Sequence, residues 1–542
     1  MKGIEVNDGR SIESDNATAG VYGELAVPGL LREWRWWLGP AVLSVALAIL
    51  FLDPFIGDWD AIDYTILALK GQPSSMALGR SLFIFFNSGL WHVAHLILNL
   101  PPEKAYLVFK YAVVVETPIT IVACWRLARE VGATPEVSTL AALMIAVSPA
   151  FVVYSGQAMT EIPSLLVLAT ALAVHAKGLR TRRIWLVLAG AAILGAGVNI
   201  RETVGFYSPW LLIAPLLYGW RFNRRDVIVT LAACLVFCFF AIGGFAFWFI
   251  TDIGHYRAAW NGWRASMAME SARHPISLAG ISPFLALFLF SSPIVSISLP
   301  FAFLWSWRRT GPSRMLVLGC VGMFATLLLL LNYSSSVNWR YFLTGLPAFA
   351  PLTAALWMGV FKTKDLDSRR SLKLSAAVIL GIALAGGLIV RPIFNRQTEK
   401  RQSTQNYSSE LLFLPKDSVV MAGAQTVAVT YWNGIGAGQW ETIGTGGGWP
   451  GNELVSVIER YLSEDKRVFL DTNPQVWPPC GWQQQEVRVL PELAMHFRFR
   501  RANGTFYEVR PMSDESAVDV PPFQKLLPEN RSEETAKCLR RE

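Results

Sequence analysis

Residues Phe55 to Tyr64 read Phe-Ile-Gly-Asp-Trp-Asp-Ala-Ile-Asp-Tyr and directly follow the first long apolar segment of the chain. Three carboxylates, Asp58, Asp60 and Asp63, lie here beside two aromatic side chains, where a membrane helix would emerge into water. Carboxylates two positions apart at a bilayer surface suit general-base or metal-binding chemistry on a lipid-linked substrate. The alternative is a hydrophilic loop whose acids are only solvated, and the remainder of the chain has to decide between the two.

The composition is that of a polytopic membrane protein. Of the 542 residues, 53% are hydrophobic and 16% are charged, whereas soluble domains carry about 25% charged residues. The mean hydropathy is +0.36. The net charge of +8 does not indicate nucleic-acid binding, because Lys and Arg lie mostly in short loops between apolar segments, where they set membrane orientation.

Hydropathy and the basic loops predict eleven membrane spans. Arg32 and Arg35 precede the first span and place the N-terminal tail, residues 1–31, in the cytoplasm, with the first span acting as an uncleaved signal anchor. The predicted spans are Trp36–Leu52, Ala105–Trp125, Val137–Tyr154, Ile162–Ala176, Ile184–Val198, Val204–Trp220, Val227–Ile250, Ile281–Trp305, Met315–Leu331, Tyr341–Phe361 and Leu374–Val390. They lie within a membrane domain of residues 32–392.

The outer loop of residues 53–104 contains a second apolar segment, Ser81–Leu100, which includes polar side chains such as Asn87 and His92. If it crossed the membrane, the basic residues of the later loops would fall on the outer side, whereas Lys and Arg are normally enriched in loops on the inner side. We therefore expect this segment to lie along the outer interface.

Residues 393–542 have the composition of a soluble domain. Ser418–Gly423 and Arg467–Thr472 are typical of buried strands, and Glu453–Ser463 between them is typical of a helix. Residues 495–510 read as a β-hairpin across an Asn-Gly turn. The sequence therefore predicts a small α/β domain, which eleven spans would place outside. There, a disulfide between Cys480 and Cys538 would be compatible with the compartment, although the sequence leaves their pairing open.

Four arginines on the predicted outer face have no role in orientation. They are Arg201, Arg257, Arg264 and Arg340. Binding an anion is one explanation, and anchoring at the interface with the stem in lipid is the alternative. Arg340 and Tyr341 open a span, where a cation is unfavourable at the helix N-terminus and a negatively charged ligand would relieve the conflict.

Two further acids lie on the same side. Glu161 opens a span within Met159-Thr-Glu-Ile-Pro. Its simplest role is interaction with its own helix N-terminus, worth about 0.3–1 kcal/mol, and a role in the site is the alternative. Glu202 follows Arg201 directly. The alternative to a role in the site is that these two side chains simply neutralise each other.

Three stretches carry a resemblance to a known family: Gly57-Asp58-Trp59-Asp60, Thr160-Glu161-Ile162-Pro163, and Asn338-Trp-Arg-Tyr-Phe-Leu-Thr-Gly-Leu-Pro-Ala-Phe. In their order along the chain they resemble the GT-C superfamily of polyprenyl-phosphate-dependent glycosyltransferases, in particular the bacterial protein O-mannosyltransferases and aminoarabinose transferases. The last stretch is similar to the Arg-Tyr-x-x-x-x-x-Pro-Ala pattern of those enzymes. The likeness extends over roughly residues 30–390 and leaves the C-terminal domain unmatched.

The resemblance implies an α-helical membrane enzyme that moves a sugar from a polyprenyl-phosphate donor to a protein, lipid or glycan acceptor. It implies a bacterial inner membrane with the site on the periplasmic side. A carboxylate would activate the acceptor hydroxyl, and we favour Asp58 with Asp60 as the second acid. The donor phosphate would meet Arg201, Arg257, Arg264, Arg340 and Tyr341, with Asp63, Glu161 and Glu202 as additional acids. If Asp58, Asp60 and Glu161 converge, their oxygens suit Mg²⁺ or Mn²⁺.

Two other classes of function compete with this interpretation. A transporter or lipid flippase would show inverted repeats and ionisable residues near mid-membrane, whereas the charges here lie mostly at span ends and no internal repeat is evident. A non-catalytic scaffold would tolerate loss of Asp58 and Asp60 without effect.

Overall fold

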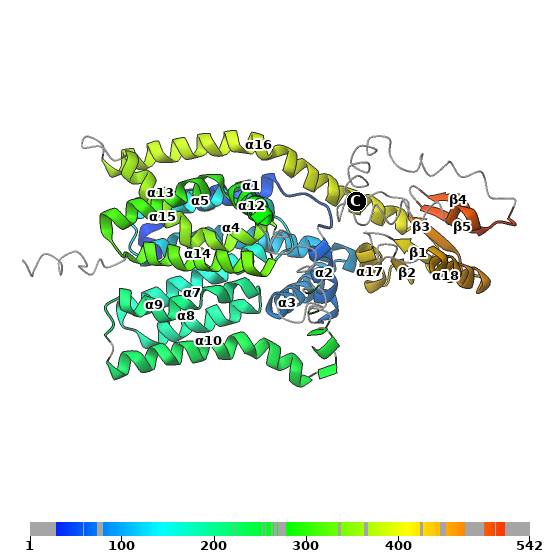
Figure 1. Ribbon diagram of the computed structural model, residues 1–542, viewed down its shortest axis with the longest axis horizontal. Coiled ribbons are helices and arrows are strands. Elements are labelled where there is room, and N and C mark those ends of the chain that lie inside the picture. Colours follow the sequence, from blue (N-terminus) through cyan, green and yellow to red (C-terminus); the bar gives the residue numbers. More distant parts are fainter. Residues whose placement is uncertain are drawn as a thin grey trace, which may run out of the picture.

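In the computed structural model the chain forms a long helical bundle with a small α/β domain at one end (Figure 1). The structure describes residues 29–514 except 58, 73–79, 222, 252, 255, 259, 262–263, 265–267, 269–277, 334–337, 362–366, 423–425, 445–450, 472–492 and 504–505. Asp58, Cys480, Cys538 and the tail of residues 1–28 therefore lie outside the described residues.

The helices of the bundle follow one another along the chain. They are α1 (Trp34–Leu50), α2 (Trp59–Lys70), α3 (Ser81–Leu98), α4 (Ala105–Glu130), α5 (Pro135–Ala146), α6 (Pro149–Tyr154), α7 (Glu161–Thr181), α8 (Ile184–Val198), α9 (Pro209–Leu217), α10 (Arg224–Thr251), α12 (Leu278–Ser291), α13 (Pro293–Thr310), α14 (Arg314–Tyr333), α15 (Leu346–Phe361) and α16 (Ser368–Leu411). Two 3₁₀ segments matter for the site: η3 (Glu202–Tyr207) and η5 (Trp339–Gly345).

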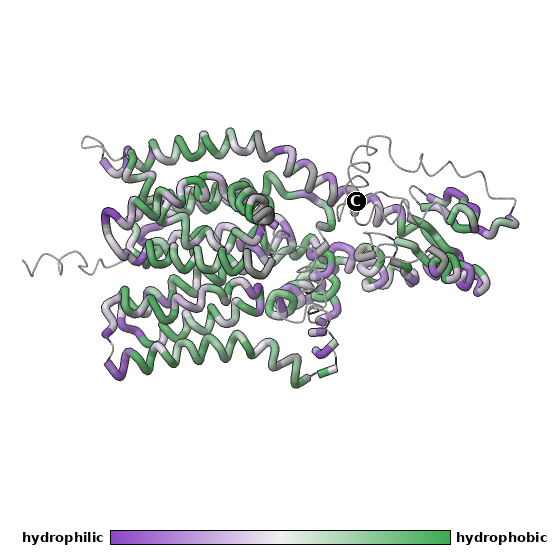
Figure 2. The backbone as a smooth tube through the Cα atoms, in the orientation of Figure 1, coloured by the Kyte–Doolittle hydropathy of each residue, from purple (hydrophilic) through white to green (hydrophobic). Residues whose placement is uncertain are grey.

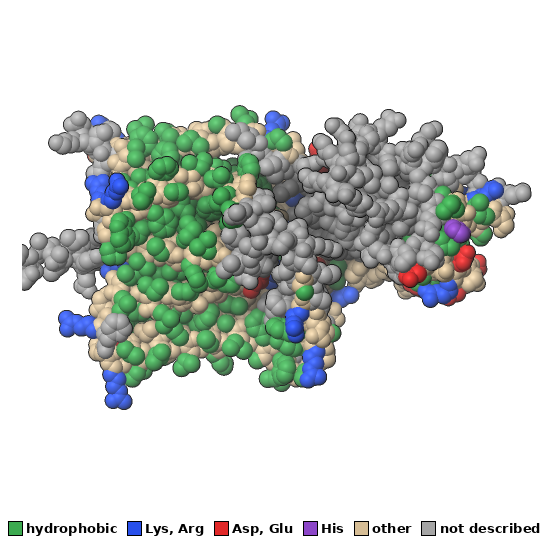
Figure 3. Space-filling model, viewed as in Figure 1, with side chains coloured by type: hydrophobic (Ala, Val, Ile, Leu, Met, Phe, Trp, Pro, Cys, Tyr) green, Lys and Arg blue, Asp and Glu red, His purple; other side chains and the backbone are tan. Residues whose placement is uncertain are grey.

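The surface of the bundle is that of an integral membrane protein. Apolar residues dominate its helices along their length (Figure 2), and the visible face carries a broad apolar band with Lys and Arg towards its ends (Figure 3). Six helices of the described chain are long and apolar enough to cross a membrane, or seven if the α12–α13 pair, bent by 104°, counts as one span. Shorter apolar helices lie at Pro135–Ala146, Ile184–Val198 and Arg314–Leu329. The helical membrane fold is therefore confirmed, while the number of eleven spans stays a prediction.

Helix α3 covers most of the apolar segment that we expect at the interface. It is also long and apolar enough to be a span, but in Figure 1 it lies across the end of the bundle beside α2 instead of running along it. Apolar side chains such as Leu96 and Ile97 are exposed on it, which suits a helix lying on lipid.

Close backbone packing holds α7, α8 and α10 together. A Cβ atom on Gly190 of α8 would lie 2.6 Å from the backbone nitrogen of His175 in α7, and one on Gly195 would lie 2.4 Å from the carbonyl oxygen of Phe237 in α10. Small residues allow such close approach in membranes, where packing rather than hydrophobicity holds helices together. The segment after α8, which carries Arg201, is thereby held against the start of α7.

The C-terminal domain contains a five-stranded sheet with the order β2-β1-β3-β5-β4. Its strands are β1 (Val419–Ala422), β2 (Glu441–Gly444), β3 (Val468–Asp471), β4 (Phe497–Asn503) and β5 (Phe506–Pro511). The first three are parallel, and β5 is antiparallel to both β3 and β4. Helices α17 (Thr426–Gly434) and α18 (Gly451–Ser463) connect the parallel strands. Strands β1 and β3, helix α18 and the β4–β5 pair coincide with the elements predicted from the sequence.

The sheet domain is joined to the bundle by one continuous helix. The predicted domain boundary between residues 392 and 393 falls inside α16, which runs through Pro392 to Leu411 without interruption. The change from apolar to polar composition thus falls inside this helix and does not mark its end.

A buried apolar cluster attaches the sheet domain to α2. Ile62 and Ile66 of α2 belong to it together with Tyr431 and Trp432 of α17, and the two helices are in contact (Figure 1). The isoleucines are four positions apart and occupy one face of α2, so the acids of this helix lie on another face. The C-terminal domain therefore packs against the face of α2 that carries the two isoleucines, and not against its acids.

A cluster of buried charged and polar side chains around Asp53 fixes the segment that leads into α2. The Oδ1 atom of Asp53 accepts a hydrogen bond from Lys110 Nζ at 2.9 Å, and Oδ2 accepts from Gln157 Nε2 at 3.0 Å and from Arg401 Nε at 2.8 Å. These partners come from α4, from the α6–α7 connection and from α16. Because a buried charge is stable only when it is paired, the group ties the start of the outer loop to three other parts of the chain.

Candidate active site

Asp60 and Asp63 lie one turn apart on α2. Asp60 Oδ2 accepts a hydrogen bond of 2.7 Å from Arg340 Nη2, across 280 residues of sequence. In the described part of the chain Asp63 has neither a salt bridge nor a hydrogen bond from its side chain. Two acids of the same helix thus have different electrostatic environments.

Arg340 is held by the 3₁₀ segment η5. The Asn338 side chain caps this segment by accepting a hydrogen bond from the Arg340 backbone N–H at 3.3 Å, and the flanking Trp339 and Phe342 are buried. Beyond Asp60, the Arg340 guanidinium reaches a second acid, with Nε 3.4 Å from Glu161 Oε1. Arg340 therefore lies between the acids of the outer loop and of α7.

Glu161 is the first residue of α7 and pairs with Arg201. Arg201 Nη1 lies 2.5 Å from Glu161 Oε1, and only 1% of the Arg201 side chain and 2% of the Glu161 side chain are exposed. Two donor atoms of Arg201, Nε and Nη2, have no hydrogen-bond partner among the described residues. Buried donors without partners are costly, and the oxygens of an anion would satisfy them.

Tyr341 covers both arginines. Its ring centre lies 4.8 Å from Arg201 Cζ and 5.3 Å from Arg340 Cζ. A ring at this distance attracts a guanidinium through its quadrupole, so Tyr341 stabilises the two cations side by side. The four charged residues and the tyrosine come from α2, α7, η5 and the segment between α8 and η3.

Arg80 is a site residue that sequence reasoning missed. It is buried, its Cζ lies 5.3 Å from the ring centre of Tyr64, and its Nη2 lies 3.9 Å from Glu202 Oε1. Its backbone has a φ of 76°, the left-handed conformation that a residue with a Cβ adopts only at a cost. Arg80 immediately precedes α3, so it is a cation at a helix N-terminus, and the argument applied to Arg340 would have found it.

The neighbouring charges move the pKa values of the two acids in opposite directions. Burial favours the neutral form of Asp60, but Arg340, Arg80 and Arg201 outweigh it and lower the pKa of Asp60. Burial and the charge of Asp60 raise the pKa of Asp63 to about 6, against a weaker effect of Arg80. Perturbation in opposite directions is common where acids have separate roles in a site.

Arg257, Arg264 and Glu202 were also predicted for the site, but they lie at other positions than the paired charges described above. Arg257 and Arg264 are exposed in the segment after α10, and no contact with Asp60, Glu161, Arg201 or Arg340 is seen in the described residues. Glu202 lies beside Arg80, whereas its sequence neighbour Arg201 faces Glu161.

The described residues do not fit the metal site considered from the sequence. Two of the expected ligands, Asp60 and Glu161, both contact the same guanidinium of Arg340, which therefore occupies the space between them. Within the described ranges no three His, Cys, Asp or Glu side chains lie together as a metal would require, and Asp58 is outside those ranges.

Two apolar cavities open on the surface of the bundle. One of about 350 Å³ is lined by Ser81, Leu82, Phe85, Ala196, Asn199, Phe240 and Gly244. It is enclosed by α3, the end of α8 and α10, and its lining residues Ser81 and Asn199 are close in sequence to Arg80 and Arg201. Several of its side chains, such as Leu82 and Phe240, are also exposed on the outside of the bundle. This cavity therefore opens on an apolar surface of the bundle, and two of its lining residues lie within two positions of Arg80 and Arg201 in the sequence.

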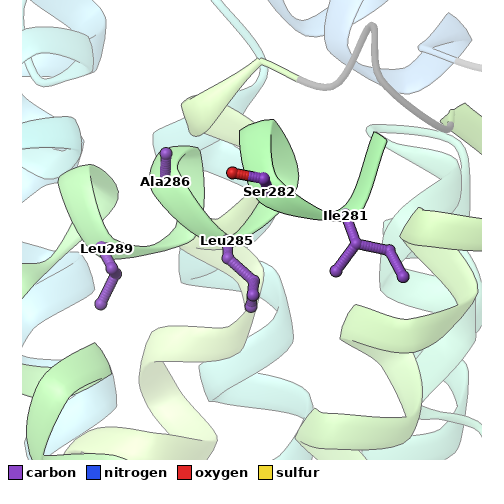
Figure 4. A pocket seen from close by; sticks show the side chains of 5 residues that line it. All are labelled: Ile281, Ser282, Leu285, Ala286 and Leu289. Atoms are coloured by element: carbon purple, nitrogen blue, oxygen red, sulfur yellow. The ribbon is translucent and has the colours of Figure 1, made fainter. Parts of the chain in front are cut away.

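The second cavity, of about 450 Å³, lies along one face of α12. Figure 4 shows the side chains that line it: Ile281, Ser282, Leu285, Ala286 and Leu289. On its buried side α12 packs against η5, where the ring centres of Phe284 and Phe342 are 4.9 Å apart. Helix α12 thus has this cavity on one face and the segment that carries Arg340 on another.

Comparison with known proteins agrees with the motifs. Residues 95–243 match the family model of dolichyl-phosphate-mannose-protein mannosyltransferases. No curated protein matches the chain in sequence. Among solved structures, ArnT from Cupriavidus metallidurans bound to undecaprenyl phosphate superposes with a TM-score of 0.55 at 10% identity, covering 88% of this chain and 98% of ArnT.

The oligosaccharyltransferase of Archaeoglobus fulgidus is also similar, with a TM-score of 0.47 at 13% identity over 88% of this chain and 74% of that protein. The family match and the shared architecture with ArnT confirm the resemblance drawn from the motifs: the chain has the fold of the GT-C superfamily of glycosyltransferases.

Proposed function

We propose that the protein is a membrane glycosyltransferase that moves a sugar from a polyprenyl-phosphate donor to an acceptor at the outer face of the membrane. The observation that carries this proposal is the chain of contacts Asp60–Arg340–Glu161–Arg201, assembled from four segments. An apolar cavity whose lining includes Ser81 and Asn199, close in sequence to Arg80 and Arg201, supports it. A lipid-phosphate donor needs this combination, because its phosphate requires cations and its tail requires an apolar groove.

The arginines differ in what they can do for a donor. The Arg340 side chain is 15% exposed and Arg201 is 1% exposed, so Arg340 is the cation that a phosphate meets first. Arg80 lies near the α3–α8–α10 cavity and adds a further positive charge. In the reaction these cations stabilise the charge that develops on the departing phosphate.

The polyprenyl tail is assigned to the cavity between α3, α8 and α10. This cavity has walls from three helices and lies beside two arginines, whereas the described lining of the α12 cavity comes from one helix. That ArnT was solved with undecaprenyl phosphate supports a donor or product of this chemical class.

The acids of the outer loop provide the base. A carboxylate of α2 accepts the proton of the acceptor hydroxyl, whose oxygen attacks the anomeric carbon while the bond from that carbon to the phosphate oxygen breaks. Asp60 contacts Arg340 directly and is the described acid that lies nearest to the proposed phosphate position. Asp58, favoured from the sequence, remains a second candidate for the base.

The proposal is tested by the glycans that the protein makes. A strain that lacks the protein should lose one sugar from its surface glycans, glycolipids or glycoproteins as measured by mass spectrometry, and the intact gene should restore it. Genes encoding Asp60→Asn or Arg340→Gln should fail to restore it while the proteins still accumulate in the membrane. An unchanged glycan profile together with altered lipid transport would favour the flippase alternative.

The location of the site at the periplasmic side of a bacterial inner membrane is part of the proposal. A reporter fused after residue 542 should be active only outside the cytoplasm, because the sheet domain contacts α2, which carries the acids. Reporter activity in the cytoplasm would place the acids on the inner face and contradict the proposed orientation.

A further inference from the structure

Arg340 has two carboxylate partners. Asp60 Oδ2 lies 2.7 Å from its Nη2, and Glu161 Oε1 lies 3.4 Å from its Nε. Glu161 also holds Arg201 at 2.5 Å. These four side chains carry two positive and two negative charges and balance one another. A donor phosphate would add negative charge to a group that is already neutral.

The two ion pairs differ in accessibility. The inner pair, Arg201 and Glu161, is almost completely buried, while 15% of the Arg340 side chain and 26% of the Asp60 side chain are exposed. The inner pair is held in place by burial, because separating buried charges is costly. An incoming phosphate therefore competes for the outer pair, and within that pair it competes with Asp60.

We propose that the donor phosphate displaces Asp60 from Arg340, so that Asp60 is released as the general base only after the donor has bound. This inference rests on the proposed function and adds an order to it: the donor binds first, and donor binding activates the base. A carboxylate bonded to a guanidinium is a weak base, because proton binding would break a charge-assisted hydrogen bond.

The chemical step then follows. The acceptor O–H gives its proton to the freed carboxylate of Asp60, and the acceptor oxygen forms a bond to the anomeric carbon. The bond between that carbon and the phosphate oxygen breaks, and its electron pair leaves with the polyprenyl phosphate, which Arg340 now neutralises. The lowered pKa of Asp60 while it is paired with Arg340 agrees with a base that is inactive in the absence of donor.

Asp63 provides a matched control. It is one turn away on the same helix, carries the same charge, and has no side-chain salt bridge or hydrogen bond in the part of the chain that the structure describes. Asp60→Asn and Asp63→Asn each remove one negative charge next to the arginines. Only Asp60→Asn weakens a bond to Arg340.

The experiment measures binding of undecaprenyl phosphate to the full-length protein in lipid nanodiscs. Asp60→Asn should bind it about tenfold more tightly than the wild type, because the phosphate no longer has to break a charge-assisted hydrogen bond. Asp63→Asn should change the affinity by about twofold or less, because it only removes a charge that lies at a distance from the phosphate position. Equal changes in the two variants, or weaker binding by Asp60→Asn, would overturn the displacement of Asp60.

Two controls keep the result interpretable. Arg340→Gln should lose most of the binding, and if the wild type itself does not bind undecaprenyl phosphate, the proposed function fails together with the inference. If Arg340→Gln loses binding but Asp60→Asn equals Asp63→Asn, only the displacement is wrong. Thermal unfolding of each variant checks the fold, and Asp60→Ser replaces Asp60→Asn if the latter does not fold.

Discussion

Arg201 Nη1 and Glu161 Oε1 lie 2.5 Å apart in the interior of the protein, although the two residues are 40 positions apart and Arg201 has an acid as its direct neighbour in the sequence. This buried pair is the inner end of the charged cluster. It holds the segment after α8 against the start of α7, and through Glu161 it also contacts Arg340, which pairs with Asp60.

The first prediction concerns this pair. Glu161→Gln should destabilise the protein by about 3–5 kcal/mol, because it leaves Arg201 buried without its partner. Arg201→Gln should destabilise it less, because Glu161 keeps its ion pair with Arg340. The double variant should lose clearly less unfolding free energy than the two single variants lose together, because it buries neither charge of the pair. Thermal and denaturant unfolding in detergent micelles would measure this, and additive effects would contradict the pairing.

The second prediction concerns pH. The pKa of Asp63 is about 6 in the folded protein and about 3.8 in the unfolded chain, so the folded state binds more protons between these values. Its contribution to stability is therefore full below about pH 4 and is lost as the pH rises towards 6. Asp63→Asn should raise the melting temperature at pH 7 and leave it nearly unchanged at pH 4.

Asp60 serves as the control, because its pKa is shifted in the opposite direction from that of Asp63. Its pKa is lowered in the folded protein, so its stabilising effect is present above the unfolded pKa and is lost on acidification. Asp60→Asn should therefore lower the melting temperature at pH 7. If both variants shifted the melting temperature in the same direction at pH 7, the two environments described for these acids would be wrong.

The third prediction concerns the tail cavity. Ala196→Trp should fill the space between α3, α8 and α10 and weaken binding of undecaprenyl phosphate about tenfold, because part of the tail would lose its apolar contacts. Binding of inorganic phosphate should not change. Ala286→Trp, in the α12 cavity shown in Figure 4, is the matched variant. A loss of affinity confined to Ala286→Trp would move the tail to α12.

The fourth prediction concerns Arg80. Its left-handed backbone costs about 1–2 kcal/mol for a residue with a Cβ, and glycine would remove this cost. Arg80→Gly should therefore keep or raise the melting temperature relative to Arg80→Ala, although both lose the stacking on Tyr64. Both variants should weaken undecaprenyl phosphate binding by several-fold, because a buried cation near the proposed phosphate position is gone. Unchanged binding would make Arg80 a structural residue.

Much of the architecture could be predicted because it depends on local properties of the chain. Apolar composition indicated helices in a membrane, buried apolar runs and a turn indicated the strands and the hairpin, and short motifs pointed to Asp60, Glu161 and Arg340. Arg201 was selected by the predicted topology, together with Arg257 and Arg264, which lie exposed after α10. The boundary at residue 392 was less well defined, because composition records the change of environment but not the end of helix α16.

The pairing of charges could not be predicted in the same way. From the sequence, Arg201 and Glu202 could have neutralised each other, yet Arg201 faces Glu161 and Glu202 lies near Arg80. Asp60 and Asp63 are equivalent in any local pattern, but only Asp60 meets Arg340. The energy of a charge depends on its distance to other charges and on its exposure to water. Residue types and helical periods follow from the order of amino acids, whereas distances and burial exist only once α2, α7, α8 and η5 have packed together.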